Sequence, residues 1–126
     1  MKMKYLLIPL FLFFLLQACF YDKEELLYMT NSNTCDTINV TYNATIFPIL
    51  STYCLSCHGN SSAASNGNGI KLENYTDLKK SIDNGKFRSA VFQDGGAVFM
   101  PKNAGKLNDC KLTQIDIWLK AGAPNN

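Results

Sequence analysis

Apolar residues recur at helical spacing in several short segments of this chain, the first of them beginning near residue 46. Ile46, Ile49 and Leu50 share one face of a first helix, which we expect over residues 46–54 with Thr45 as its N-cap. A face of this kind must be buried against another element, so the segment predicts a helix that packs into a core.

Three more helices are expected further along the chain. Two are short and cover residues 77–83 and 87–92, and a longer last helix is capped by Asn108 or Asp109. The apolar residues of the last helix are Leu112, Ile115, Trp118 and Leu119. Together with the first helix, these segments predict an all-α domain of three to four helices joined by long loops.

Between the first two helices, residues 59–69 are rich in glycine, serine and asparagine, which predicts a flexible loop. Trp118 is the only tryptophan of the chain. We expect it to be a packing residue where the last helix crosses the first, near Phe47 or Leu50. The helices are few and short for a domain with its own core, so the pattern by itself suggests that something else helps to fill the centre.

A separate apolar run of 12 residues, 5–16, follows Lys2 and Lys4. It is too short to span a bilayer, which takes about 20 residues, but it is typical of the h-region of a signal peptide. The next residues, Leu16-Gln17-Ala18-Cys19, resemble a bacterial lipobox. This resemblance implies cleavage before Cys19 and lipidation of that cysteine. The alternative is an ordinary secretory signal with an incidental cysteine.

These features divide the chain into a signal peptide over residues 1–18, a lipid-anchored tether over 19–34 and one folded domain over 35–126. The net charge of +2 comes from two lysines of the signal peptide, so the rest of the chain is neutral and has no basic patch. We therefore do not expect it to bind nucleic acid. Acidic residues soon after Cys19 resemble sorting signals, so the expected place is the bacterial cell envelope, facing the periplasm or at the cell surface.

The clearest motif is Cys54-Leu55-Ser56-Cys57-His58. A Cys-x-x-Cys-His sequence is typical of covalent c-type haem attachment. Each thiol can add to one vinyl group of the porphyrin, and the histidine that follows can bind the iron as its proximal ligand. His58 is the only histidine of the chain, so no other imidazole competes for this role.

Two other readings of the same cysteine pair are open. Cys54 and Cys57 could form a redox-active dithiol, although the strand-rich context of such motifs is missing from the sequence. They could also provide half of a zinc site, although a second pair of ligands with metal-binding spacing is missing too. We therefore favour haem over a dithiol or zinc.

Three features together resemble the class I mono-haem cytochrome c family: residues 54–58, the pair Met100-Pro101, and the closing run from Trp118 to Pro124. The resemblance extends over about residues 35–124. It implies a small cytochrome c fold whose loops wrap one covalently bound haem c, with His58 and Met100 as the axial ligands. The alternative for Met100 is an ordinary core methionine.

Within this interpretation the five cysteines of the chain can all be assigned. Cys19 takes the lipid, and Cys54 and Cys57 take the haem. Cys35 and Cys110 remain, and an oxidising compartment favours a disulfide between them. The two helices next to them touch in the cytochrome c fold. A loop of about 75 residues closed in this way should add roughly 4 kcal/mol to the free energy of unfolding.

The resemblance implies an electron-transfer protein and not an enzyme, because an iron with His/Met ligation has no free position for a substrate. Its partners would be redox proteins, a respiratory complex among them, recognised through apolar surface near the haem edge. The basic residues that could add a local field are Lys71, Lys86, Arg88, Lys102 and Lys106. The main alternative is a haem enzyme or a gas or peroxide sensor with an open sixth site. A structural or zinc-binding lipoprotein without haem is a further one.

Overall fold

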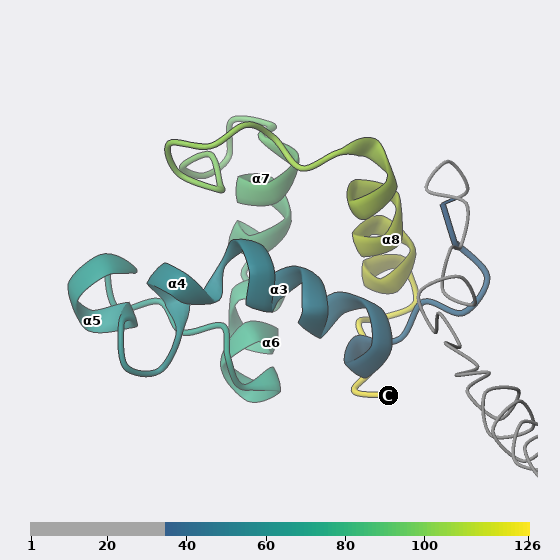
Figure 1. The fold of residues 1–126 in the computed structure, drawn as a ribbon, viewed down its shortest axis with the longest axis horizontal. Helices are drawn as coiled ribbons and strands as arrows, with labels where there is room; N and C mark the ends of the chain where they lie inside the picture. The colour runs from purple at the N-terminus through teal and green to yellow at the C-terminus, as the bar shows by residue number, and fades with distance from the viewer. Residues whose placement is uncertain (1–34) are drawn as a thin grey trace, which may run out of the picture. The chain divides into compact units, whose positions relative to one another are not determined.

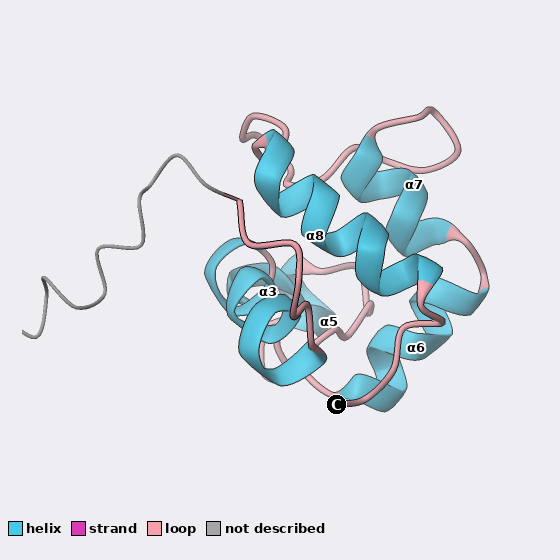
Figure 2. Cartoon of the chain, turned by 90° about the vertical axis from the view of Figure 1, so that its right-hand side faces the viewer, coloured by secondary structure: helices cyan, strands magenta, loops and turns pink. Residues whose placement is uncertain are grey.

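The computed structural model describes residues 35–126, and this part of the chain contains helices and loops but no strand (Figure 2). The helices are the π-helix η1 (Tyr42–Ile46) and the α-helices α3 (Phe47–Tyr53), α4 (Leu55–His58), α5 (Ala63–Asn66), α6 (Tyr75–Asp83), α7 (Lys86–Phe92) and α8 (Asp109–Lys120) (Figure 1). The predicted all-α class is confirmed for residues 35–126.

The predicted signal peptide (1–18), the lipidation of Cys19 and the tether (19–34) lie outside the described residues. The structure therefore leaves these expectations as they stand. None of the helices within residues 35–126 combines the length and the apolar character that a membrane-spanning helix needs.

The first helical segment begins earlier than the sequence suggested, and the prediction of Thr45 as N-cap is wrong. Thr41 is the cap: its backbone is extended and its Oγ1 accepts a hydrogen bond from the backbone N–H of Ala44 at 3.2 Å. The reason is the burial of Tyr42, which extends the apolar face by one turn. η1 continues directly into α3, where the proline at position 48 is tolerated in the first turn.

Trp118 is a packing residue, as predicted, and its side chain is fully buried. Its ring is stacked on that of Tyr42, with the centroids 5.9 Å apart, and its Nε1–H donates to the carbonyl oxygen of Pro124 at 2.9 Å. Phe47 and Tyr75 both meet Tyr42 edge-on, at centroid distances of 6.1 and 5.3 Å. Tyr42 is thus the residue through which α8 packs on the first helical segment, and the sequence pattern missed it.

Helices α6, α7 and α8 lie close to their predicted positions. α6 and α7 begin two residues and one residue earlier than expected, and both end as expected. Asn108 is the N-cap of α8, because its Oδ1 accepts a hydrogen bond from the backbone N–H of Lys111 at 3.0 Å.

The expectation of a flexible loop over residues 59–69 is wrong in part, because this segment contains α5. The side chain of Ala63 is fully buried, and α5 packs against α4. Backbone hydrogen bonds from Ala63 to Gly59 (2.8 Å) and from Gly67 to Ala63 (3.0 Å) make successive turns. Ala63 is the apolar residue that holds this segment in place, and one such residue produces no hydrophobic period in the sequence.

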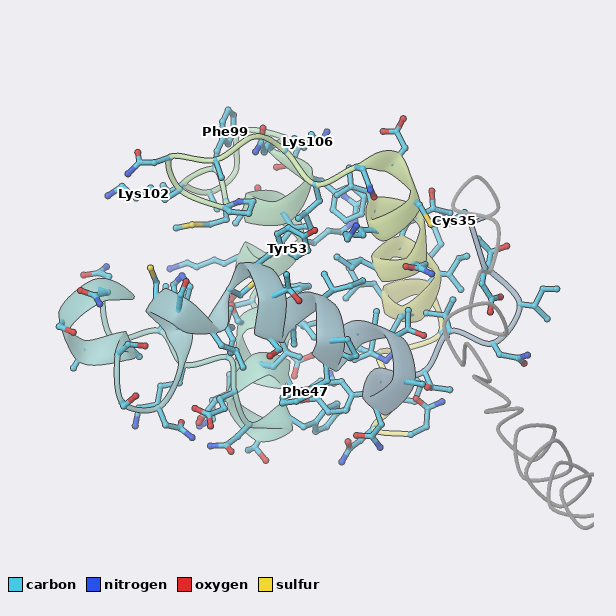
Figure 3. All side chains as sticks on the ribbon, viewed as in Figure 1. Cys35, Phe47, Tyr53, Phe99, Lys102 and Lys106 are labelled. Atoms are coloured by element: carbon cyan, nitrogen blue, oxygen red, sulfur yellow. A yellow bond between two sulfur atoms is a disulfide. The ribbon has the colours of Figure 1, made fainter. Side chains whose placement is uncertain are left out.

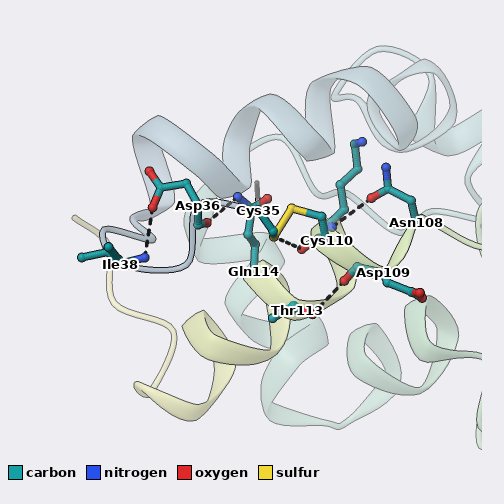
Figure 4. Close-up of a disulfide and its surroundings, with 9 residues drawn as sticks. Cys35, Asp36, Ile38, Asn108, Asp109, Cys110, Thr113 and Gln114 are labelled. Atoms are coloured by element: carbon teal, nitrogen blue, oxygen red, sulfur yellow. Dashed lines mark hydrogen bonds between the residues drawn. A yellow bond between two sulfur atoms is a disulfide. The ribbon is translucent and has the colours of Figure 1, made fainter. Parts of the chain in front are cut away.

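Cys35 and Cys110 are joined by a disulfide with a Cα–Cα distance of 5.4 Å, as the sequence led us to expect. The bond connects the segment before η1 to the first turn of α8 (Figure 4). A second link lies beside it: Nε2 of Gln114 donates to the carbonyl oxygen of Asp36 at 2.8 Å. Both hold the start of the described chain against α8.

Candidate functional site

The motif residues 54–58 form one helical turn at the junction of α3 and α4. The backbone N–H of His58 donates to the carbonyl oxygen of Cys54 at 2.8 Å, and that of Cys57 approaches the same oxygen at 3.1 Å. Residues three and four apart on such a turn are neighbours. The structure therefore brings Cys54, Cys57 and His58 together on one short element, as the motif predicts.

The two thiols of this turn have different surroundings. Cys54 packs against the hydrophobic core, and burial raises the pKa of its thiol to about 11, whereas Cys57 is exposed. Both are free thiols in this structure. Redox-active Cys-x-x-Cys pairs have a thiol pKa that is lowered toward neutrality. The raised pKa of Cys54 therefore counts against the dithiol reading of the motif.

His58 is buried, with 9 % of its surface exposed, and its ring has a fixed hydrogen-bond partner. Nδ1 lies 2.9 Å from the carbonyl oxygen of Ile70. A carbonyl oxygen can only accept, so Nδ1 carries a proton, and in the neutral ring this leaves the lone pair on Nε2. The backbone oxygen of His58 in turn accepts from the N–H of Leu72 at 2.9 Å. Histidines that bind a metal are held in a similar way, with the second ring nitrogen on a backbone carbonyl or a carboxylate.

Gly67 lies against the same ring, and only glycine fits at this position. A Cβ atom there would lie 2.5 Å from the carbonyl oxygen of Cys57 and 2.9 Å from Nδ1 of His58. Glu73 fixes the turn after the histidine, since its Oε2 accepts from the backbone N–H of Asn60 at 2.6 Å. Residues 67–73 therefore hold His58 from several directions. This role leaves no signal in the local sequence, because the segment has no hydrophobic period.

Met100 lies in the loop between α7 and α8, apart in the sequence from the motif, and is partly buried. In Figure 1 this loop lies in the upper left of the view, above α4. The backbone N–H of Met100 donates to the carbonyl oxygen of Ala90 at 3.0 Å, and its own carbonyl oxygen accepts from Nε2 of Gln93 at 3.2 Å. The methionine is thus attached to the end of α7.

The same loop carries exposed apolar and basic side chains. Val98 and Phe99 are 68 % and 51 % exposed, and Lys102 and Lys106 extend from the loop nearby (Figure 3). Arg88, one of the basic residues expected to contribute to a docking field, lies close to acidic groups of this loop and of α8. Its guanidinium nitrogens lie 3.7 Å from Asp94 and 3.4 Å from Asp116.

The residues at hand fit a haem c in three respects. Two thiols lie one helical turn apart, the following imidazole is hydrogen-bonded through Nδ1 and not through Nε2, and the turn that carries them packs against the apolar core. Within residues 35–126 no three side chains of histidine, cysteine, aspartate or glutamate gather into a metal-binding group. Comparison with family models, with curated proteins and with solved structures gives no match for this chain.

Proposed function

We propose that this chain is an electron-transfer protein that carries one haem c, bound covalently through Cys54 and Cys57, with His58 and Met100 as axial ligands. The observation that carries the proposal is the hydrogen bond from Nδ1 of His58 to the carbonyl oxygen of Ile70, at 2.9 Å. It fixes the tautomer in which Nε2 can bind iron, and it does so directly after two cysteines of the attachment motif.

Each protein group has a separate part in this function. The two cysteines would hold the haem, and the buried imidazole would bind its iron from one side. The thioether of Met100 is neutral, and Met/His ligation raises the reduction potential of a haem. When bound, a haem of this kind supplies one exchangeable electron. With both axial positions taken there is no place for a substrate, so we propose a carrier and not an enzyme.

In the same proposal, the fold is a small cytochrome c fold and the apolar haem fills part of its centre. The described helices support this, because all except α8 have nine residues or fewer, and two long loops, over residues 67–74 and 93–108, connect some of them. Such a domain gains much from a large apolar group held between its loops.

We further propose that lipid on Cys19 anchors the protein in the bacterial cell envelope, where it exchanges electrons with redox proteins, a respiratory complex among them. The Cys35–Cys110 disulfide supports this placement, because disulfides persist in oxidising compartments. Cys19→Ser should leave a protein that carbonate washes off membranes. Retention of this variant on the membrane would contradict the lipid anchor.

The covalent attachment is tested by intact mass. The full chain, produced in cells that mature c-type haem, should carry one haem that acid-acetone does not extract. Cys54→Ala with Cys57→Ala should lose it. The matched control is Cys35→Ala with Cys110→Ala, which also removes two cysteines but should keep the haem. Covalent haem in the Cys54/Cys57 double variant would overturn the proposal.

A further inference from the structure

Gln93 ends α7 in a backbone conformation that a glutamine rarely adopts. Its φ is 58° and its ψ is 44°, which is the left-handed region. Helices often end with such a residue, but it is usually glycine and sometimes asparagine, because a larger side chain is unfavourable there. A glutamine held in this conformation suggests that its side chain has a task that glycine could not perform.

That side chain contacts the proposed sixth ligand. Nε2 of Gln93 donates to the carbonyl oxygen of Met100 at 3.2 Å, across seven residues of sequence. The other backbone polar group of Met100 is also held, because its N–H donates to the carbonyl oxygen of Ala90 at 3.0 Å. Ala90 lies in the last turn of α7, where carbonyl groups have no partner within the helix. The end of α7 therefore holds Met100 at both of its backbone polar groups.

The chain directly before Met100 offers little apolar packing. Val98 and Phe99, the two residues before it, are largely exposed. The position of the methionine therefore depends strongly on the two hydrogen bonds to α7. The bond from Gln93 is one of these two, and the only one made by a side chain.

We propose that Gln93 is a positioning residue for Met100: its amide holds the backbone of the methionine and so restrains the sulfur as an iron ligand. This inference rests on the proposed function, because it needs Met100 to bind a haem iron. Gln93 itself does not touch the iron in this proposal. Its effect is to slow the release of the sulfur and not to change the chemistry of the haem.

Two variants of Gln93 separate the hydrogen bond from the backbone conformation. Gln93→Glu keeps the shape of the side chain but replaces its N–H donor with an acceptor. Gln93→Gly also removes the donor, but it relieves the unfavourable φ. The matched control is Gln114→Glu, because Gln114 also donates from Nε2 to a backbone carbonyl, that of Asp36 at 2.8 Å, next to the disulfide.

The first measurement is hydrogen exchange at the backbone N–H of Met100, which can be made with or without haem. Loss of one neutral hydrogen bond should speed exchange about fivefold in Gln93→Glu and Gln93→Gly, and leave it unchanged in Gln114→Glu. Unchanged exchange in both Gln93 variants would overturn the inference, whatever the state of the haem.

The second measurement is the rate at which carbon monoxide binds to the reduced haem protein, since the sulfur must leave before the gas can bind. Both Gln93 variants should bind it about fivefold faster than the parent protein and Gln114→Glu. If Gln93 were only structural, Gln93→Gly would bind carbon monoxide at the parent rate, and this result would overturn the inference. Absence of covalent haem from the parent protein would show instead that the proposed function is wrong.

Discussion

The two regions that carry the proposed axial ligands are built in different ways. His58 is 9 % exposed and is held through its ring as well as its backbone, by Ile70, Leu72 and the close approach of Gly67. The backbone of Met100 is hydrogen-bonded to the end of α7, and the two residues before it are largely exposed. We call these regions the histidine side (residues 54–73) and the methionine side (residues 93–107).

This difference indicates how the two ligands would behave. A ring held by a hydrogen bond and tight packing has one orientation, which is what the proposed role of His58 as iron ligand requires. A loop attached by few hydrogen bonds opens at a lower free energy than a packed core segment. The methionine side should therefore open more readily than the histidine side. Substitutions there should alter the reduction potential and the ligand binding of the haem without detaching it.

Met100→Ala should have the largest effect of the substitutions that test this difference between the two sides. The haem should stay attached, because the thioether bonds to Cys54 and Cys57 are untouched. The reduction potential should fall, and carbon monoxide or cyanide should bind at once, since one axial position becomes free. Redox titration and ligand-binding kinetics measure the two changes.

The control for this variant is Met29→Ala, at a position outside the described residues. It removes the other methionine that remains after the predicted signal cleavage and should change neither property. An equal response to both substitutions would show that Met100 is not the sixth ligand.

A smaller effect is expected when one glycine on the histidine side and one on the methionine side are each replaced by alanine. In Gly67→Ala the new Cβ would lie 2.5 Å from the carbonyl oxygen of Cys57, so the backbone or the His58 ring must shift. The free energy of unfolding should fall by about 1–3 kcal/mol. Gly105→Ala, on the methionine side, meets no atom within 4 Å and should change that free energy by less than about 1 kcal/mol.

Urea denaturation of both glycine variants measures this difference. Equal losses of stability would mean that the histidine side is no more tightly packed than the methionine side, and the comparison would fail.

The smallest effect is expected at Asp94, where the methionine side begins. A hydrogen bond from Ser89 holds the pKa of its carboxyl below the usual 3.8, and the backbone N–H of Gly96 adds to this at 3.1 Å. A lowered pKa in the folded state means that the charged group stabilises the fold above the unfolded pKa. This contribution is lost as the pH falls through the folded pKa.

Asp94→Asn should therefore be slightly less stable than the parent at neutral pH, and the two should converge as the pH falls below 3.8 and through the lowered pKa. Urea denaturation at neutral pH and over a series of acid pH values checks this. Ser89→Ala removes the main cause of the lowered pKa and should reduce the difference. If Asp94→Asn remains less stable than the parent in acid, the carboxylate charge is not the cause of the difference in stability.

The sequence predicted those parts of the molecule that depend on spacing along the chain. Apolar residues at helical intervals predicted α6, α7 and α8, and the expected cap of α8 was Asn108 or Asp109, of which the structure uses Asn108. The cysteine pair and His58 share one turn because they are three and four residues apart.

The parts that the sequence did not predict depend on contacts between segments. Tyr42 extends the first helical segment because it stacks on Trp118, which lies far away in the sequence. Glycine is needed at position 67 because the chain there comes back into contact with His58. Gln93 has a left-handed backbone conformation that glutamine does not favour. None of these contacts leaves a period or a motif in the local sequence.

The central claim is that one haem is attached to the histidine side and that Met100, on the methionine side, is its sixth ligand. The absorption spectrum of the reduced full-length protein, recorded before and after carbon monoxide is added, tests it most directly. We predict a sharp α-band that the gas does not change within the time of mixing. An absent α-band would contradict the haem, and an immediate, complete shift with carbon monoxide would contradict Met100 as the sixth ligand.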